Sequence, residues 1–286
     1  MKRFKPASEW TTQFSQQGCF DHVNAMMAFD EWQGWAKPTA LQTLLPYEVK
    51  NLNNKFIEFV EQGATQDYSA VAYEEFIYET GKIPTRKESW HDLFGAFSWC
   101  LFPKTKAKIN QLHYLDIKQL GTQSGSKPRS KLRDALTLFD ECGVVLATKN
   151  KTLLDALKNH KWQQAFIELR HCWSEKNEQG VMAYQFGHAN YEMLTNPFIG
   201  LTGKWLVLDI SAEIGSLPLN VQYRMIDERL AEQLEQGILQ DNSQLFPLPL
   251  LGVPNWYDKN EDDSFYDNTD YFRPKRADSN AQDNKE

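Results

Sequence analysis

The stretch from Trp90 to Leu101, Trp-His-Asp-Leu-Phe-Gly-Ala-Phe-Ser-Trp-Cys-Leu, carries the clearest secondary-structure signal in the chain. Its apolar residues recur at intervals of three and four, the spacing of one face of an α-helix. Pro103 follows after one further residue and ends the helix, because proline has no backbone N–H to donate. The sequence therefore predicts a helix that buries one apolar face and carries His91 and Asp92 in its first turn.

Further helices are predicted on both sides of this stretch, because apolar residues keep the same spacing there. The predicted ranges are 52–79, 105–115, 151–159, 161–174 and 221–236, with a short helix that ends near residue 194. Residues 1–45 hold short apolar clusters without a sustained period. We expect that segment to wrap around the domain rather than to form its centre.

The strand signal is confined to two regions. Ala135–Phe139 and Val144–Thr148 are β-prone runs separated by four turn-forming residues, which predicts a hairpin near 134–148 with Gly143 at positive φ. A second β-prone run predicts a strand near 204–210. These strands are too few for a doubly wound sheet, and no fixed repeat is visible. The predicted fold class is α+β, predominantly helical with a small antiparallel sheet.

The predicted domain organisation is a single globular domain over residues 1–257. Residues 258–286 hold nine Asp or Glu against five Lys or Arg, so we expect an acidic C-terminal tail whose last fifteen or so residues are disordered. The segment 245–254 is rich in Pro and Leu and is expected to lie extended across the domain surface.

Composition narrows the possible partners and location. A net charge of −7 repels phosphate backbones at long range, so broad nucleic-acid binding is not expected. The four cysteines form no CxxC pair and are expected to be reduced. No secretory signal and no apolar run of membrane-spanning length is visible. The expected location is the cytoplasm, with a small molecule or a protein as partner and no membrane.

No established catalytic motif is present, so the candidate site rests on polar residues in apolar surroundings. His91 lies at the edge of the apolar stripe and can reach a metal ion or a substrate proton, whereas Asp92 can equally serve to cap the helix. Lys106, Asn110 and His113 share one face of the next predicted helix. If that helix folds back, this face meets His91 and Asp92.

Two more candidate pairs follow along the chain. Arg133 and Asp134 enter the predicted hairpin, and strand alternation places Asp134 beside core residues, where a carboxylate needs an arginine or a metal as partner. His188 and Glu192 lie four residues apart on a short helix, where such a pair can orient the imidazole for base or metal work, although a salt bridge is favoured. Asp140 and Glu141 are interpreted as turn residues. The basic residues in and after the flexible loop 121–131 can grip a phosphate, although mobile basic loops are common: Lys127, Arg129, Lys131 and Arg133.

An ordered set of motifs resembles the uncharacterised bacterial family known as domain of unknown function 3025, from about residue 70 to residue 275, with a family-like core of about 70–257. The motifs are Trp90-His91-Asp92, the Phe102–Lys106 turn with Asn110 and His113, Arg133–Glu141, Phe186-Gly187-His188 and Leu248–Pro254. The family has no assigned activity, so the resemblance implies membership without a mechanism. It implies that six residues belong to family motifs: His91, Asp92, His113, Arg133, Asp134 and His188. The resemblance also implies Asn where this chain has Gly95, one helical turn after His91.

Two functional hypotheses remain open. In the first, which we favour slightly, the protein is a hydrolase-like enzyme whose His and Asp residues converge on one cleft as acid and base or as ligands of a divalent metal. In the second, the same residues form a buried polar network in a binding or scaffold protein whose aromatic and Pro-Leu segments dock a partner. Convergence of these side chains on one pocket favours the enzyme, and dispersal favours the scaffold.

Overall fold

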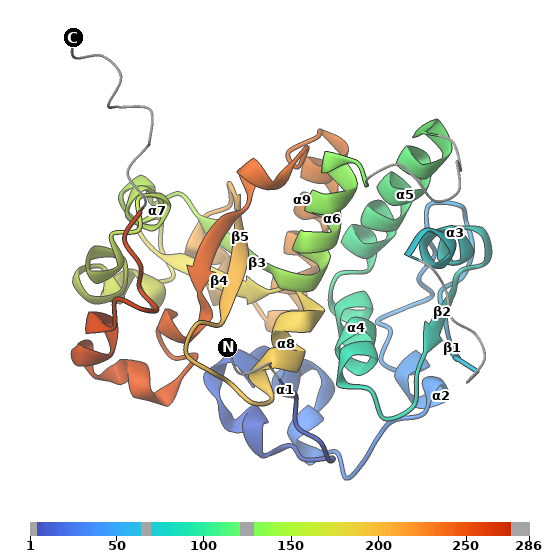
Figure 1. Cartoon of the computed structure of the whole chain (residues 1–286), viewed down its shortest axis with the longest axis horizontal. Helices are drawn as coiled ribbons and strands as arrows, with labels where there is room; N and C mark the ends of the chain where they lie inside the picture. The colour runs from blue at the N-terminus through green and yellow to red at the C-terminus, as the bar shows by residue number, and fades with distance from the viewer. Residues whose placement is uncertain (1–4, 64–69, 121–128, 276–286) are drawn as a thin grey trace.

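The computed structural model describes residues 5–63, 70–120 and 129–275, and Figure 1 shows how their elements are arranged. The α-helices are α1 (Asp21–Met27), α2 (Pro38–Gln42), α3 (Ala70–Thr80), α4 (Trp90–Leu101), α5 (Pro103–Leu120), α6 (Lys131–Cys142), α7 (Lys151–Lys158), α8 (His188–Leu194) and α9 (Leu219–Glu235). The strands are β1 (Glu58–Glu61), β2 (Lys82–Thr85), β3 (Gly143–Thr148), β4 (Val181–Gln185), β5 (Thr202–Leu208) and β6 (Phe246–Pro249). The predicted α+β class with a majority of helix is confirmed.

The larger sheet has four strands in the order β4-β3-β5-β6. Strand β3 pairs antiparallel with β4 and parallel with β5, while β6 pairs antiparallel with β5. The sequence had predicted an antiparallel sheet, but the sheet is mixed, because β3 and β5 run parallel. A separate parallel pair joins β1 to β2 on the other side of the molecule, and helices α4, α5 and α6 lie between the two sheets (Figure 1).

The prediction of a hairpin near 134–148 is wrong in its first half, because Ala135–Phe139 belongs to helix α6. The Ser130 hydroxyl accepts a hydrogen bond from the backbone N–H of Arg133 and so caps the start of this helix. The strand in the second half is confirmed as β3. Gly143 joins the two with a φ of −66°, and a Cβ there would lie 2.4 Å from the carbonyl oxygen of Phe139. Close approach of backbone, rather than positive φ, therefore requires glycine.

The helix predicted over 52–79 is present only in its last third, as α3. Residues 58–61 form strand β1 instead, because β2 supplies a hydrogen-bonding partner that is distant in sequence. The N-terminal segment also lies deeper than predicted. Phe20 and Phe29 are fully buried, and both rings contact Phe94 of α4. This segment therefore supplies part of the core rather than only wrapping around it.

The C-terminal part packs further along the chain than the predicted boundary at 257. Tyr266, Tyr271 and Phe272 are buried, so the packed region continues to residue 272. The Pro-Leu segment 245–254 is also inside, since residues 246–249 form β6 and the side chains of Leu248, Leu250, Leu251 and Val253 are almost completely buried. Residues 276–286 of the predicted disordered tail lie outside the described residues.

Helices α4, α5, α6 and α8 provide the framework for the polar residues. Helix α8 packs against both α4 and α6, and α5 packs against α4, α6 and α9. The Ser89 hydroxyl caps α4 by accepting the backbone N–H of Asp92. In the described part of the chain, no helix combines the length and the apolar character needed to cross a bilayer.

Candidate functional site

A cavity of about 400 Å³ lies where α3, β2, α4, α5, α6 and α8 converge, and this volume is within the range of small-molecule sites. Each helix presents one polar face to it, because residues three, four, seven and eight apart share a side of a helix. Its polar and charged lining includes Arg86, His91, Asp92, Lys106, Asn110, His113, Arg129, Arg133, Thr137, Asp140, Glu141 and His188.

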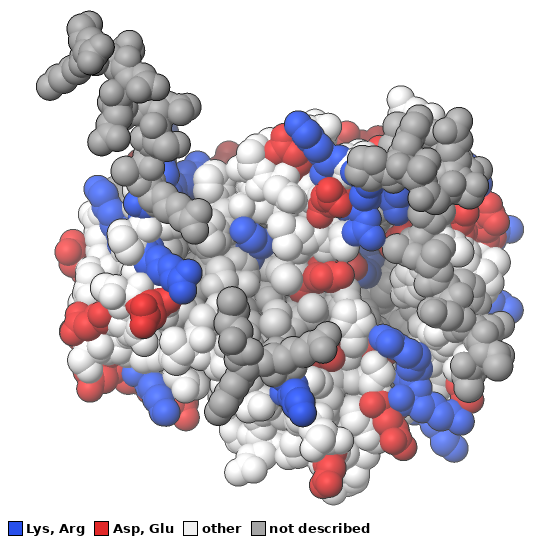
Figure 2. Space-filling model, in the orientation of Figure 1, with Lys and Arg blue, Asp and Glu red and all other residues white. Residues whose placement is uncertain are grey.

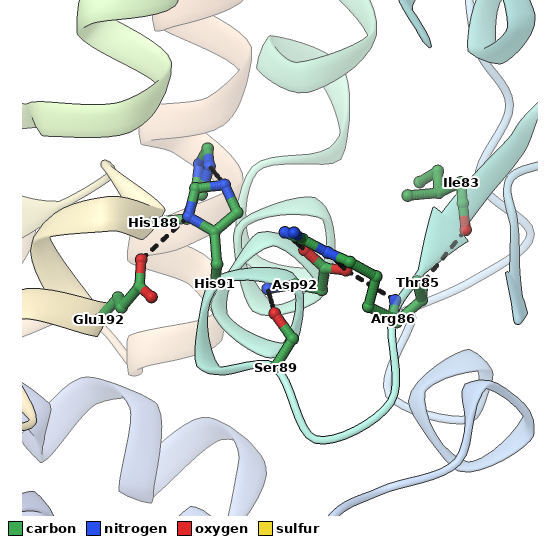
Figure 3. A network of polar contacts seen from close by, with 8 residues as sticks. All are labelled: Ile83, Thr85, Arg86, Ser89, His91, Asp92, His188 and Glu192. Carbon is green, nitrogen blue, oxygen red and sulfur yellow. Dashed lines mark hydrogen bonds and ion pairs between the residues drawn. The ribbon is translucent and has the colours of Figure 1, made fainter. Parts of the chain in front are cut away.

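Two histidines from different helices face each other at one end of the cavity. The Nε2 atoms of His91 on α4 and His188 on α8 are 3.1 Å apart, and Nδ1 of His91 is 3.0 Å from Oε2 of Glu192 (Figure 3). On the far side of His188, Nδ1 is 3.7 Å from Oδ2 of Asp140, which is an ion-pair distance rather than a hydrogen bond. The two imidazoles are therefore joined to each other and flanked by a carboxylate at each outer nitrogen.

This arrangement determines how many protons the histidine pair prefers. Each outer nitrogen faces a carboxylate oxygen and is favoured as an N–H donor, and the two inner nitrogens need one proton between them. The favoured total is three protons, which gives the pair one positive charge. Burial lowers the pKa of His91, but the hydrogen bond and the charge of Glu192 outweigh it and raise the pKa overall. Burial lowers the pKa of His188 to about 3, so the positive charge resides on His91.

The carboxylates of the cavity have defined partners. Lys106 Nζ donates to Oδ1 of Asp140 at 2.5 Å, and although burial acts to raise the pKa of Asp140, the charge of Lys106 lowers it overall. Asp92 accepts from the backbone N–H, Nε and Nη2 of Arg86 (Figure 3). Asp92 is therefore held by a bidentate arginine, beyond the helix capping considered from sequence. Burial raises the pKa of Glu141, which makes it a second proton-transfer candidate.

The other end of the cavity holds polar atoms without partners. Arg133 is only 8% exposed, and its Nε makes no hydrogen bond to a described residue. His113 is 3% exposed, and its Nδ1 is likewise unpaired. Burial lowers the pKa of the His113 imidazole, so the ring is neutral near pH 7. Buried polar atoms of this kind normally find a partner, so this end of the cavity can accept a ligand.

Five of the six residues that the sequence nominated line this one cavity: His91, Asp92, His113, Arg133 and His188. The sixth, Asp134, does not. Its side chain is 50% exposed and lies 3.9 Å from Arg129 on the outside of α6, because the segment is a helix and not the strand whose alternation turned Asp134 inward.

Three important residues were misjudged from sequence. Asp140 and Glu141, interpreted as turn residues, lie on the cavity face of α6. Glu192 was paired with His188 but bonds His91 of another helix. A helical period counted from Arg133 would have found the first two, since 133, 137, 140 and 141 share one face. No local signal in the sequence indicates that Glu192 contacts His91.

Neither a broad basic surface on the face shown in Figure 2 nor a metal-binding cluster is found in the described part of the chain. On the face shown in Figure 2, acidic and basic side chains are interspersed rather than gathered in a broad basic patch. Within residues 5–63, 70–120 and 129–275, no three His, Cys, Asp or Glu side chains are grouped so that they could hold a metal ion. All four cysteines are free.

Comparison with known proteins gives a family and nothing closer. No curated protein and no solved structure matches the chain. A family model described as Protein of unknown function (DUF3025) matches residues 57–276, which extends beyond the predicted family-like core at both ends. The chain belongs to the DUF3025 family.

Proposed function

We propose that the protein is a hydrolase-type enzyme in which His91 and His188 transfer protons to and from a small substrate bound in the cavity. The observation that carries the proposal is the imidazole pair with a carboxylate at each outer nitrogen. A pair of this kind stores one proton between two rings and keeps both rings in a fixed orientation. The His91 side chain is 35% exposed, whereas that of His188 is 10% exposed, so protons enter and leave through His91.

In this proposal His91 is the general base, Glu141 is the general acid and Glu192 positions His91. When the pair has lost its shared proton, Nε2 of His91 accepts a proton from the attacking water, whose oxygen forms the new bond to the electrophilic centre of the substrate. The bond to the leaving group breaks, and that group receives a proton from Glu141, whose pKa burial raises. Glu192 orients His91 and stabilises its protonated form, which makes Glu192 a positioning residue.

The test is a hydrolysis assay with p-nitrophenyl esters of phosphate, of a phosphodiester and of a carboxylic acid. We expect His91→Gln to lower kcat/KM for the best substrate at least about 100-fold, the usual contribution of a general base. His171→Gln is the matched control, because His171 is exposed and does not line the cavity. Hydrolysis of none of the three substrates, or a loss below threefold in His91→Gln, would overturn the proposal.

A pH profile separates orientation from chemistry. Because Glu192 raises the pKa of His91, Glu192→Gln should move the acidic limb of the kcat/KM profile to lower pH as well as lower its maximum. An unchanged limb would show that the limb does not report His91.

A non-catalytic binding protein is the second candidate, and one observation favours it. The cavity contains the ion pairs Arg86–Asp92 and Lys106–Asp140, which satisfy charges within the protein as a structural network does. Binding of a ligand without any His91-dependent turnover would support this candidate over the enzyme.

A further inference from the structure

We infer that Arg133, His113 and Arg129 form a subsite for a phosphate group at the end of the cavity opposite the histidine pair. The subsite would hold the phosphate of the substrate on which that pair acts, and to this extent the inference rests on the proposed function. Binding of the phosphate itself does not require the reaction, so the two ideas can be tested apart.

Two buried side chains at this end of the cavity have polar atoms without partners among the described residues. Arg133 is more than nine-tenths buried, lines the cavity and forms no ion pair with a described residue. His113, buried to the same degree on the facing helix α5, also has a ring nitrogen without a partner. A buried guanidinium is costly unless it is paired, so an anion is the ligand that completes this end of the cavity.

The positive charge of Arg129 and Arg133 also favours an anionic ligand at this end of the cavity. Arg129 precedes α6 and also lines the cavity, where its Nη1 donates to the hydroxyl of Thr137. Burial and then the nearby charge of Arg129 lower the pKa of Arg133, and together they outweigh the more weakly acting carboxylates of Asp116, Glu74 and Asp134. A carboxylate ligand carries one negative charge, whereas a phosphate ester carries up to two. Arg129 has only a long ion pair, 3.9 Å to the exposed Asp134, so a phosphate can neutralise Arg133 and also attract Arg129, and its tetrahedral oxygens accept from their forked N–H groups.

Helix geometry sets the distance between this end of the cavity and the histidine pair. On α6, Arg133 precedes Asp140 by seven residues, and on α5, His113 follows Lys106 by seven. Lys106 binds Asp140, and the same seven-residue step along each helix leads to His113 and to Arg133. The two side chains therefore lie at the same level, roughly 10 Å along the helix axes from the Lys106–Asp140 pair. A ligand that spans the cavity therefore has its phosphate at one end and its reacting bond at the other.

The side-chain oxygen of Asn110 indicates what the ligand carries beside its phosphate. Asn110 donates from Nδ2 to Glu74, but its Oδ1 is buried and accepts nothing from a described residue. It lies one helical turn from His113 and also lines the cavity. A ligand with a hydroxyl or amino donor beside its phosphate would satisfy this oxygen. The class of ligand is therefore a small phosphomonoester that carries at least one hydrogen-bond donor.

The test is isothermal titration calorimetry of the full chain with inorganic phosphate and with acetate at 0.15 M NaCl and pH 7.5. We expect phosphate to bind at least tenfold more tightly than acetate. Arg133→Met should weaken phosphate at least about tenfold, the usual loss of a charged hydrogen-bond partner. Arg129→Met should weaken it by a smaller factor, and because Arg129 is partly exposed this variant keeps the test valid if Arg133→Met does not fold.

Two control variants make the result specific. Arg224→Met removes an exposed arginine of α9 outside the cavity and should leave the affinity unchanged. His91→Gln should bind phosphate as the wild type does, even where it abolishes turnover. Equal affinities for acetate and phosphate, no phosphate binding by the wild type, or full binding by both Arg129→Met and Arg133→Met would each overturn the subsite. Turnover that depends on His91 without phosphate binding would overturn the subsite alone, and phosphate binding without such turnover would overturn the enzyme alone.

Discussion

Replacing Arg133 by methionine is expected to stabilise the ligand-free protein. Methionine retains an aliphatic stem of similar length and has almost the same helix propensity as arginine, so packing in α6 changes little. The substitution removes a buried guanidinium whose Nε has no partner among the described residues and which Arg129 repels. A buried polar group without a hydrogen bond costs about 1–3 kcal/mol, so we expect the free energy of unfolding to rise by about 1 kcal/mol.

The matched substitution is Lys106→Met on the facing helix, for which we expect the opposite sign. Lys106 also lines the cavity, and its side chain is 10% exposed, but it is paired with Asp140. Removing it leaves the Asp140 carboxylate largely buried and without its cation, which typically costs about 3 kcal/mol or more. Two cation-to-methionine changes in one cavity should therefore shift stability in opposite directions.

The measurement is urea denaturation followed by circular dichroism, in phosphate-free buffer and again with phosphate. Phosphate should stabilise the wild type, by about 2.7 kcal/mol at a concentration 100 times its dissociation constant, and should not stabilise Arg133→Met. The reasoning is refuted if Arg133→Met loses more than 1 kcal/mol in phosphate-free buffer. That outcome would mean that Arg133 holds the fold together as Lys106 does.

The structure also predicts how the free energy of unfolding depends on His188, Gly95 and Asp227. Because burial lowers the pKa of His188 from 6.5 to about 3, the stability of the wild type relative to His188→Gln should fall by on the order of 3 kcal/mol between pH 7 and pH 4 in urea titrations at both pH values. A Cβ at Gly95 would meet nothing within 4 Å, so Gly95→Ala should raise stability by about 1 kcal/mol in thermal denaturation, and a lower melting temperature would contradict the open space. Burial raises the pKa of Asp227 to about 6 despite hydrogen bonds from the backbone N–H groups of Lys104 and Thr105. The stability of the wild type relative to Asp227→Asn should therefore be greatest below pH 4 and fall as pH rises through 6, whereas a rise would show that the amides favour the carboxylate.

The local sequence was enough to predict that α4 is a helix, but not that α6 is one. The apolar residues of α4 are spaced for a helix only, and Ser89 and Pro103 mark its two ends, so its prediction is confirmed. In α6 the segment Ala135–Phe139 alternates well enough for a strand and is also spaced for a helix. The cap at Ser130 and burial against neighbouring helices decide between them.

The residue types of the site could be predicted, but not their pairing. Histidines and charged residues in apolar motifs were recognisable, and five of the six nominated residues line one cavity. The contact of His91 with Glu192 joins residues 101 apart, and that of Lys106 with Asp140 joins residues 34 apart. Such contacts depend on how α4, α5, α6 and α8 pack, which no periodicity within one helix encodes.

The errors at Asp134 and at Asp140 have a single cause, which shows why α6 is central to the cavity. In the predicted hairpin, strand alternation turned Asp134 towards the core, and Asp140 lay in the turn. In a helix, Asp134 rotates outward and Asp140 joins the face of Arg133. One helical face thus carries both a carboxylate that is satisfied by Lys106 and an arginine whose buried Nε has no partner among the described residues. Since packing alone would favour an apolar side chain at position 133, a ligand that brings its own negative charge would explain why an arginine stands there.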